Sequence, residues 1–355
     1  MEALFRHVSL SITAAGCKNR CKHCSENAIV SDPVLIPYEQ VQKAVALVCA
    51  ENDRKAPLYA EINPCLFLEP MDHPDVVRIQ VLLHDLNPTA PLVRTIATNG
   101  QRIAADPDYE RLIHGLQECG LEKFQLTLHG LERTHDRFVA RRGAYSSLLE
   151  AARRVASVGV RVDWVFFLTK NNVGEFAEMI LSARAAALGS ESINIWGPAG
   201  RAGRHARLLA TAEDLERLPS EIRAMSMLPE YRPESDWVED ARTWRMGPAL
   251  RRFRESARVL GGIPDGRIGI TRDNIADLPK TLDELRGRAS RQPETPPASD
   301  PSDSEILCLV EAYGDPESRV LYRISTMYQE WRRRQRELIG RVKRDSNARA
   351  TKHKE

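Results

Sequence analysis

Three cysteines near the amino terminus have the spacing of ligands for an iron-sulfur cluster. Cys17, Cys21 and Cys24 follow one another as C-x3-C-x2-C within Ser9–Ala28, in a loop expected directly after a strand. Thiolates on such short loops can converge on one cuboidal cluster, because each sulfur can point inward at an iron. The motif has no fourth cysteine. One iron would therefore stay open to a ligand from outside the protein.

Two other interpretations of these cysteines are a zinc site and three unrelated buried thiols. Zinc sites usually join a C-x2-C pair to a second ligand pair downstream, and no such pair follows at a suitable distance. His23 could be a fourth zinc ligand, but it directly precedes Cys24, so its ring can hardly reach the same metal. The iron-sulfur interpretation is favoured.

The motif resembles that of the radical S-adenosylmethionine (SAM) superfamily. The resemblance implies one [4Fe-4S] cluster, with the amino and carboxylate groups of SAM on the open iron. His23 then stands where the family usually has an aromatic residue beside the cofactor. It also implies reductive cleavage of SAM to a 5'-deoxyadenosyl radical, which abstracts a hydrogen atom from a substrate. An external reductant such as flavodoxin or ferredoxin would supply the electron.

Apolar runs of strand length alternate with amphipathic helical segments between residues 4 and 200. The expected strands are 4–13, 58–63, 92–99, 123–130, 161–169 and 192–197, with helical segments such as 38–52 and 145–158 between them. This alternation predicts a parallel sheet with right-handed crossovers. Six units are too few for an eight-stranded barrel.

Polar residues recur at alternate positions of several strands, as in His7, Ser9 and Ser11 or in Glu61 and Asn63. A parallel strand covered by helices on both faces would be apolar throughout. The stripes therefore indicate a curved sheet with a wet concave face. We expect the α/β fold that the resemblance implies, a partial (β/α)6 TIM-like barrel with a carboxyl-terminal, mostly helical extension.

A second match follows the second strand, in the stretch NPCLFLEPMDHPDV. The family often has GGEP here, followed by HPD. Phe67 and Leu68 replace the two glycines, whereas Glu69 and the triad 73–75 fit the pattern. The resemblance implies that Phe67, Leu68 and Glu69 meet the amino group of SAM, largely through backbone oxygens. The alternative for Glu69 is an acid that merely flanks a helix.

Further matches lie at the ends of later strands. Thr98 and Asn99 in RTIATNG look like a strand-end turn of the family, and Thr127 stands where a serine often lies near the cofactor ribose. Arg141 and Arg142 occupy positions from which a basic residue can reach the cofactor carboxylate, which arginine binds bidentately. The alternative for these arginines is a basic pair on the surface.

Two further residues are candidate site residues because each ends an expected strand. Trp196 ends the sixth strand and could bound the adenine. Cys65 ends the second strand and could donate a hydrogen atom in an epimerisation, although packing is the favoured role. The remaining cysteines, Cys49, Cys119 and Cys308, lie in apolar or helical contexts and are expected to be structural.

Composition divides the chain into five parts. Residues 1–205 are expected to form the barrel, and 206–288 an extension similar to SPASM/twitch modules but without their auxiliary-cluster cysteines. Residues 289–304 are rich in proline, serine and acids and predict a flexible linker. Residues 305–342 read as helical with a break at 313–316, and the basic tail 343–355 is expected to be disordered.

Bulk properties limit the remaining classes. With 355 residues, 42% of them hydrophobic, the chain can bury a sizeable core, and its net charge of +2 gives no argument for nucleic acid or membrane partners. It has no run of 18 apolar residues and no signal peptide pattern. We therefore expect a soluble, cytoplasmic protein, in a compartment where thiols stay reduced.

The expected substrate is a small metabolite of specialised, natural-product biosynthesis. The chain begins at its first strand without a leader-binding module, and it lacks auxiliary-cluster cysteines. Alternatives are epimerisation, crosslinking or dehydrogenation of a ribosomally made peptide, and RNA modification, which the basic tail suggests. A non-enzymatic scaffold that carries zinc or a cluster is the last alternative.

Overall fold

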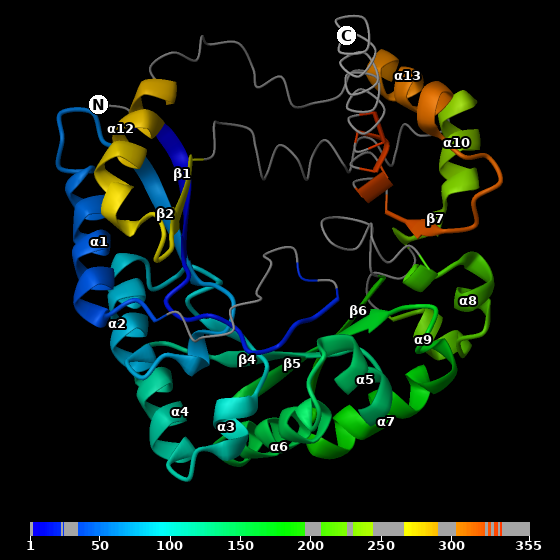
Figure 1. Ribbon diagram of the computed structural model, residues 1–355, viewed down its shortest axis with the longest axis horizontal. Coiled ribbons are helices and arrows are strands. Elements are labelled where there is room, and N and C mark those ends of the chain that lie inside the picture. The colour runs from blue at the N-terminus through cyan, green and yellow to red at the C-terminus, as the bar shows by residue number, and fades with distance from the viewer. Residues whose placement is uncertain are drawn as a thin grey trace, which may run out of the picture.

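The structure is a computed structural model that describes residues 3–22, 24, 35–195, 207–225, 230–243, 266–289, 303–323, 326–327, 330–332 and 334–335. In these residues, two parallel sheets make the inner wall of a horseshoe (Figure 1). The first sheet has the order β2–β1–β8, with β1 at Phe5–Ile12, β2 at Tyr59–Leu66 and β8 at Gly266–Ile270. The second has the order β3–β4–β5–β6, with β3 at Thr95–Thr98, β4 at Lys123–Leu128, β5 at Arg161–Leu168 and β6 at Gly189–Ile195. The predicted α/β partial barrel is confirmed.

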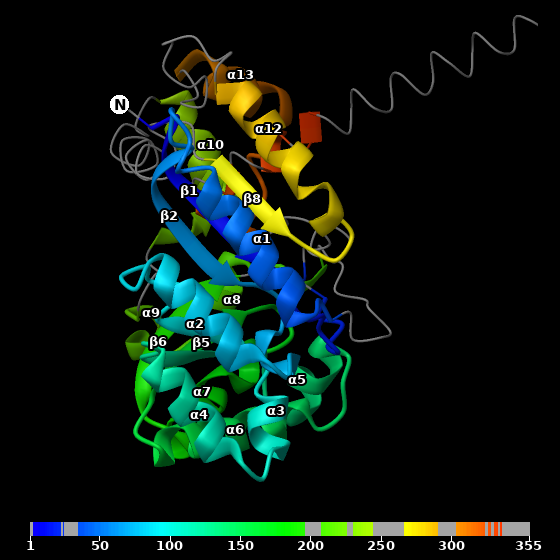
Figure 2. The same ribbon diagram turned by 90° about the vertical axis from the view of Figure 1, so that its left-hand side faces the viewer.

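Helices cover the outside of this wall (Figures 1 and 2). In chain order they are α1 (Tyr38–Ala50), η1 (Pro70–Asp72), α2 (Val76–Leu86), α3 (Gln101–Ala105), α4 (Tyr109–Glu118), α5 (Glu132–Val139), α6 (Ala144–Ser157), η2 (Val173–Glu175) and α7 (Phe176–Ala186). No helix in the described ranges has both the length and the apolar character that a membrane span requires.

The helices pack against the first sheet because apolar side chains repeat every second residue along the strand and on one face of the helix. Val8 and Leu10 alternate along β1, and Val41, Val45 and Val48 recur along one face of α1; all five are buried in one cluster. Removing this apolar area from water stabilises the layer at roughly 25 cal/mol per Å². Figure 2 shows α1 in front of the strands that it covers.

The second sheet is built in the same way. Leu126 and Leu128 of β4 lie in one buried cluster with Leu148, Ala152 and Val155 of α6. The spacing of three and four residues along α6 matches one face of a helix. Each sheet therefore has its own core on the outer side, and the opposite faces of both sheets look into the horseshoe.

The inner face of the first sheet carries the polar stripe predicted from the sequence. In register, Ser9 of β1 lies beside Asn63 of β2 and Arg267 of β8, and Ser11 lies beside Cys65. Residues that pair in a parallel register point to the same side of the sheet. The predicted extension 206–288 thus contributes a strand to the barrel sheet itself.

A smaller lobe forms the other arm of the horseshoe (Figure 1). Its elements are α8 (Ala212–Glu216), α9 (Ser220–Arg223), β7 (Arg232–Pro233), α10 (Glu234–Arg242), α13 (Asp303–Tyr313) and β9 (Leu321–Tyr322). The short strands β7 and β9 pair antiparallel. After β8, η5 (Ile275–Asp277) and α12 (Leu278–Ala289) return to the first sheet, where Leu278 and Leu282 are buried.

Some boundaries differ from the sequence expectation. Within the predicted extension, the stretch 211–224 forms two helices, α8 and α9, because Pro219 cannot continue the first helix. The helical stretch 305–342 is interrupted by β9, whose residues pair with the distant β7. Residues 290–302 and 336–355, which hold most of the predicted linker and the whole basic tail, lie outside the described residues.

Candidate cofactor and cluster site

The cysteine loop leaves the carboxyl end of β1 and is tied to α5 by its backbone. Arg20 donates its N–H to the carbonyl of Val139 at 2.9 Å, and Lys22 donates to the carbonyl of Phe138 at 3.1 Å. Within the loop, the N–H of Cys24 donates to the carbonyl of Cys21 at 3.1 Å. The loop is thereby held against the end of a helix that lies more than 100 residues away in sequence.

The three cysteine thiols lie close enough to interact electrostatically. Burial raises the pKa of Cys17 to about 11, and the carboxyl of Glu69 adds to this effect. Burial raises the pKa of Cys21 to about 12, with further contributions from Cys17 and Cys24. Because their pKa values are raised, Cys17 and Cys21 need a strong cationic partner to become thiolates. This donor set suits an iron-sulfur cluster.

A zinc site is the alternative for this loop. No three His, Cys, Asp or Glu side chains of the described residues are arranged to hold a single metal ion. In an iron-sulfur cubane each thiolate binds a different iron. The three sulfurs of a cluster therefore need not meet the geometry of a single-ion site. His23, the candidate fourth zinc ligand and candidate cofactor neighbour, lies outside the described residues.

The turn after β2 brings Phe67, Leu68 and Glu69 beside the start of the cysteine loop. The N–H of Phe67 donates to the carbonyl of Ile12, the last residue of β1, at 2.9 Å. Leu68 has a φ of 63°, in the left-handed region that favours glycine. Leucine thus adopts the backbone that the second glycine of the GGEP pattern would adopt without strain.

Glu69 is 2% exposed and connects this turn to the end of β3. Its carboxylate accepts hydrogen bonds from the Thr98 hydroxyl at 2.5 Å and from the Asn99 N–H at 2.6 Å. Burial raises the pKa of Glu69 to about 8, and the hydrogen bonds from Thr98 and Asn99 oppose that rise. The acid does more than flank a helix, because it joins two strand ends.

Asn99 extends this connection to the cysteines. Its side-chain amide lies 3.8 Å from the Cys17 sulfur and its side-chain oxygen accepts from the N–H of Gln101 at 3.0 Å. The Gln101 side chain donates in turn to the buried Asn19 of the cysteine loop at 2.7 Å. Cys17, Glu69, Thr98 and Asn99 therefore form one contact network.

The HPD triad has a positioning role. The His73 ring contacts the carbonyl of Ile36 at 2.8 Å through Nε2, and its Nδ1 accepts from the N–H of Asp75 at 3.0 Å. Arg102 donates to the carbonyl of Met71 at 2.7 Å. These bonds fix the chain on both sides of the Glu69 turn.

The remaining barrel candidates lie on the inner face of the sheets. Thr127 is half-buried on β4, in register with Val165. Cys65 is half-buried on β2, and burial raises the pKa of its thiol. Neither side chain has a described contact with the cysteine loop. Trp196, the candidate adenine neighbour, lies outside the described residues.

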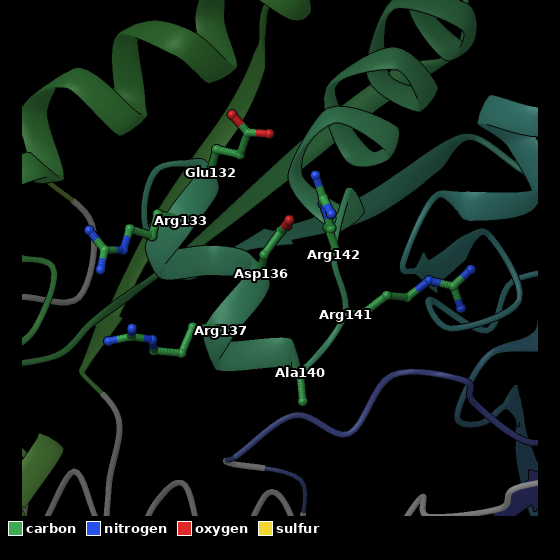
Figure 3. Close-up of a pocket in the computed structure, with 7 residues that line it drawn as sticks. All are labelled: Glu132, Arg133, Asp136, Arg137, Ala140, Arg141 and Arg142. Atoms are coloured by element: carbon green, nitrogen blue, oxygen red, sulfur yellow. The ribbon is translucent and has the colours of Figure 1, made fainter.

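A pocket of about 480 Å³ lies along α5 and the turn that follows it. Glu132, Arg133, Asp136, Arg137, Ala140, Arg141 and Arg142 line it. Figure 3 shows that Arg133 and Arg137 extend to one side of the helix, whereas Arg141 extends to the other. The turn has its shape because Asp136 accepts hydrogen bonds from the N–H groups of Gly143 at 2.5 Å and Tyr145 at 2.9 Å.

Sequence reasoning missed two sets of residues. Arg267 points into the barrel from β8, and the alternation of polar and apolar residues in GRIGI was the available signal. The second set consists of cations beside the cysteine loop. Burial, Arg137 and Arg207 lower the pKa of Lys22, which places three positive charges near one another. No local motif marks this set, because its members come from three segments.

The solved structures similar to this chain are larger proteins. Streptococcus suis SuiB bound to the precursor peptide SuiA matches at 14% identity with a TM-score of 0.41, covering 79% of this chain and 52% of SuiB. Coproporphyrinogen III oxidase (HemN) from Escherichia coli matches at 14% identity with a TM-score of 0.42, covering 64% of this chain and 54% of HemN. The chain thus spans about half the length of either protein. No curated protein matches the sequence.

The family comparison covers the residues that carry the site. Residues 11–183 match the model described as the radical SAM superfamily. This range begins in β1 and includes the cysteine loop, the Glu69 turn, the end of β3 and all of α5. Residues 11–183 of this chain are therefore similar to the radical SAM superfamily, and the candidate site lies within them.

Proposed function

We propose that this protein is a radical SAM enzyme that uses one [4Fe-4S] cluster and SAM to abstract a hydrogen atom from a small polar metabolite in a specialised biosynthetic pathway. The observation that carries the proposal is the network that connects Cys17 to Glu69 through Asn99 and the end of β3. It joins the loop expected to hold the cluster to the turn expected to hold the cofactor. A cytoplasmic location, where thiols stay reduced, is part of the proposal.

Cys17, Cys21 and Cys24 would hold the cluster in this proposal. When bound, the cluster and SAM supply a 5'-deoxyadenosyl radical, formed together with methionine by one-electron cleavage of a carbon–sulfur bond, which takes a hydrogen atom from a substrate C–H bond. The chain's own residues bind and orient the cofactor and exclude water from the site. The tie between the cysteine loop and α5 keeps the loop in place for this task.

Glu69 would bind the amino group of the cofactor, and the sulfonium of SAM would supply a nearby positive charge. The carboxylate of Glu69 is buried and receives hydrogen bonds from Thr98 and Asn99, both formally neutral. A nearby cation favours the ionised form of such a carboxyl. The other cofactor-binding roles are proposed for His23, Phe67, Leu68, Thr98, Asn99, Thr127, Arg141 and Trp196, as the family resemblance implies.

The inner face of the sheets supports a polar substrate. Ser9, Asn63 and Gln125 offer neutral donors and acceptors on this face, and Arg267 adds a positive charge. A substrate with hydroxyl, amide or carboxylate groups would find partners along this wall. Cys65 remains a proposed hydrogen donor if the reaction is an epimerisation.

Modification of a ribosomally made peptide is the alternative function. The same polar wall would also suit a peptide backbone, whose N–H and carbonyl groups need hydrogen-bond partners. The two functions differ in what raises the yield of 5'-deoxyadenosine, because a bound substrate consumes the radical. Small polar metabolites and short peptides are therefore tested in parallel in the assay below.

The experiment loads the protein anaerobically with iron and sulfide and then adds dithionite and SAM. We expect a [4Fe-4S] absorbance and electron paramagnetic resonance signal, and 5'-deoxyadenosine and methionine in equal amounts. Cys24→Ser should abolish the signal and the products, because one iron loses its thiolate. Cys308→Ser is the matched control, because this exposed cysteine lies on α13.

A loaded cluster that never yields 5'-deoxyadenosine, with any of the substrates offered, would contradict the proposed function. Zinc bound with four protein ligands would contradict it more directly. Metal analysis of the purified protein, before any iron is added, separates these two results.

A further inference from the structure

Five positively charged residues lie in the cysteine loop or beside it, and we call them the basic face. Its members are Arg20 and Lys22 of the loop, Arg133 and Arg137 of α5, and Arg207. All except the half-buried Lys22 are exposed. The set combines three segments of the chain that only the fold brings together.

Backbone contacts and electrostatic interactions place these residues side by side. The N–H groups of Arg20 and Lys22 donate to the last two residues of α5. Lys22 also interacts electrostatically with Arg137 and Arg207. Arg133 lies one helical turn before Arg137, and Figure 3 shows both side chains on the same side of α5. Residues four apart share one face of a helix.

Among the described residues, no ion pair neutralises the positive charge of the basic face. No ion pair joins its five side chains to an acidic residue of the described segments, whereas Arg153, Arg161 and Arg184 elsewhere each pair with a glutamate. Asp136 on α5 is already engaged by the N–H groups of its own turn. Glu132 is the other acid of that pocket, and it lies at the start of α5.

The basic face is attached to the part of the chain that holds Cys21. Phe138, Val139, Leu208 and Leu209 are buried in one apolar cluster, and Cys21 packs against it. Arg137 precedes the first two of these residues, and Arg207 precedes the other two. A molecule bound to the basic face would therefore lie beside a proposed cluster ligand.

We propose that the basic face is the docking surface for an acidic electron-carrier protein, which delivers the electron that cleaves SAM. This inference rests on the proposed function, in which each cleavage consumes one electron. Opposite charges accelerate the encounter of two proteins more than they tighten the complex. That balance suits a carrier that must leave after each transfer.

The main test compares two electron sources on the cluster-loaded enzyme. The variant Arg133→Glu/Arg137→Glu reverses two charges of the basic face, and Arg111→Glu reverses one exposed arginine of α4 as a control. With reduced flavodoxin, we expect the double variant to form 5'-deoxyadenosine with kcat/KM for flavodoxin lowered about tenfold or more. With dithionite, wild type and variant should have equal rates, and the control should match wild type in both assays.

Direct binding gives a second readout that does not depend on catalysis. Oxidised flavodoxin is titrated into each protein by calorimetry at about 20 mM and about 200 mM salt, where screening differs strongly. Wild type should bind more weakly at high salt, and the double variant should bind weakly at both. If the double variant does not fold by circular dichroism, Arg207→Glu takes its place.

The outcomes separate this inference from the proposed function. An unchanged flavodoxin-driven rate in a folded variant that is active with dithionite overturns the docking surface alone. Equal losses with both reductants overturn it as well, because they show a structural role for these arginines. Transfer RNA binding is measured for wild type and for the double variant as well. If the double variant loses this binding but keeps the wild-type flavodoxin binding and rate, the docking surface is overturned in favour of a nucleic acid partner. Wild type that is inactive with dithionite refutes the proposed function instead.

Discussion

Two buried glutamates in different regions of this protein have opposite surroundings. Glu234, in the lobe that holds β7 and β9, is 0% exposed and receives both terminal nitrogens of Arg334, at 2.7 and 3.0 Å. Glu69, in the turn after β2, is 2% exposed and is bonded by the hydroxyl of Thr98 and the N–H of Asn99. The described residues place no such arginine on Glu69.

This difference distinguishes a structural carboxylate from one prepared for a ligand. A buried charge with a bidentate arginine is neutralised within the fold. A buried carboxyl that has only neutral donors favours its protonated form, and burial raises the pKa of Glu69 to about 8. In the proposed function, SAM, which is a sulfonium cation, supplies the missing positive charge.

The largest effect on stability is expected when the buried Glu234 loses its arginine partner. Arg334→Met should destabilise the protein by about 3 to 5 kcal/mol, because it leaves Glu234 buried without its cation. Thermal unfolding at neutral pH measures this loss. The double variant Glu234→Gln/Arg334→Met should recover most of the stability. A single variant with unchanged unfolding would show that this ion pair does not stabilise the lobe.

The second prediction concerns Glu69 and pH. Because its folded pKa is raised to about 8, the folded state keeps a proton that the unfolded state releases above its ordinary pKa. Stability should therefore fall as pH rises from about 4.5 to about 8, with a total loss of a few kcal/mol. Glu69→Gln should remove this fall, so its advantage over wild type grows with pH. Unfolding by urea at several pH values measures the difference.

SAM binding sharpens this prediction. If bound SAM pairs with Glu69, its binding at pH 7 should release up to about one proton from that carboxyl, because the carboxyl ionises. Calorimetry in buffers of different ionisation enthalpy counts the protons, and Glu69→Gln should release about one proton fewer than wild type. Equal proton release by wild type and variant would mean that the cofactor does not pair with Glu69.

The smallest effect is expected from the backbone of the same turn. Leu68→Gly removes the strain of a leucine at φ 63°, and we expect a gain of about 0.5 kcal/mol. Ala140→Gly is a matched control, because Ala140 has a φ of 54° and is exposed at the end of α5. A gain at Ala140 with a loss at Leu68 would show that the leucine side chain contributes packing that outweighs its strain.

The sequence predicted the barrel well because its strands are long and regular. The spans of β1, β4 and β5 lie within or close to the expected ranges, and their apolar residues repeat with the period of a strand. The spacing of Cys17, Cys21 and Cys24 is local and needed no fold for its recognition. Patterns contained in a few consecutive residues can be recognised without a structure.

What the sequence could not predict depends on distant pairings. The contact of Glu69 with Thr98 joins residues 29 positions apart, so the sequence predicted each residue as a candidate but not their hydrogen bond. The two-residue strands β7 and β9 are too short for any period. β8 has five residues, and its pairing with β1 places Arg267 in the barrel. The place of a residue such as Arg267 depends on the order of the strands in the sheet, which the sequence alone does not give.

The pairing of β8 with β1 also sets an order of events during synthesis. β1 is an inner strand only when residues 266–270 lie along its free edge, and Arg286 of α12 then pairs with Glu51, 235 residues earlier. Contacts of such wide sequence separation form late, because the long loop must close first. The strand that precedes the cysteines thus completes its sheet only after residues 266–270 have emerged from the ribosome, so in the proposed function iron and sulfide would reach a finished site late in synthesis.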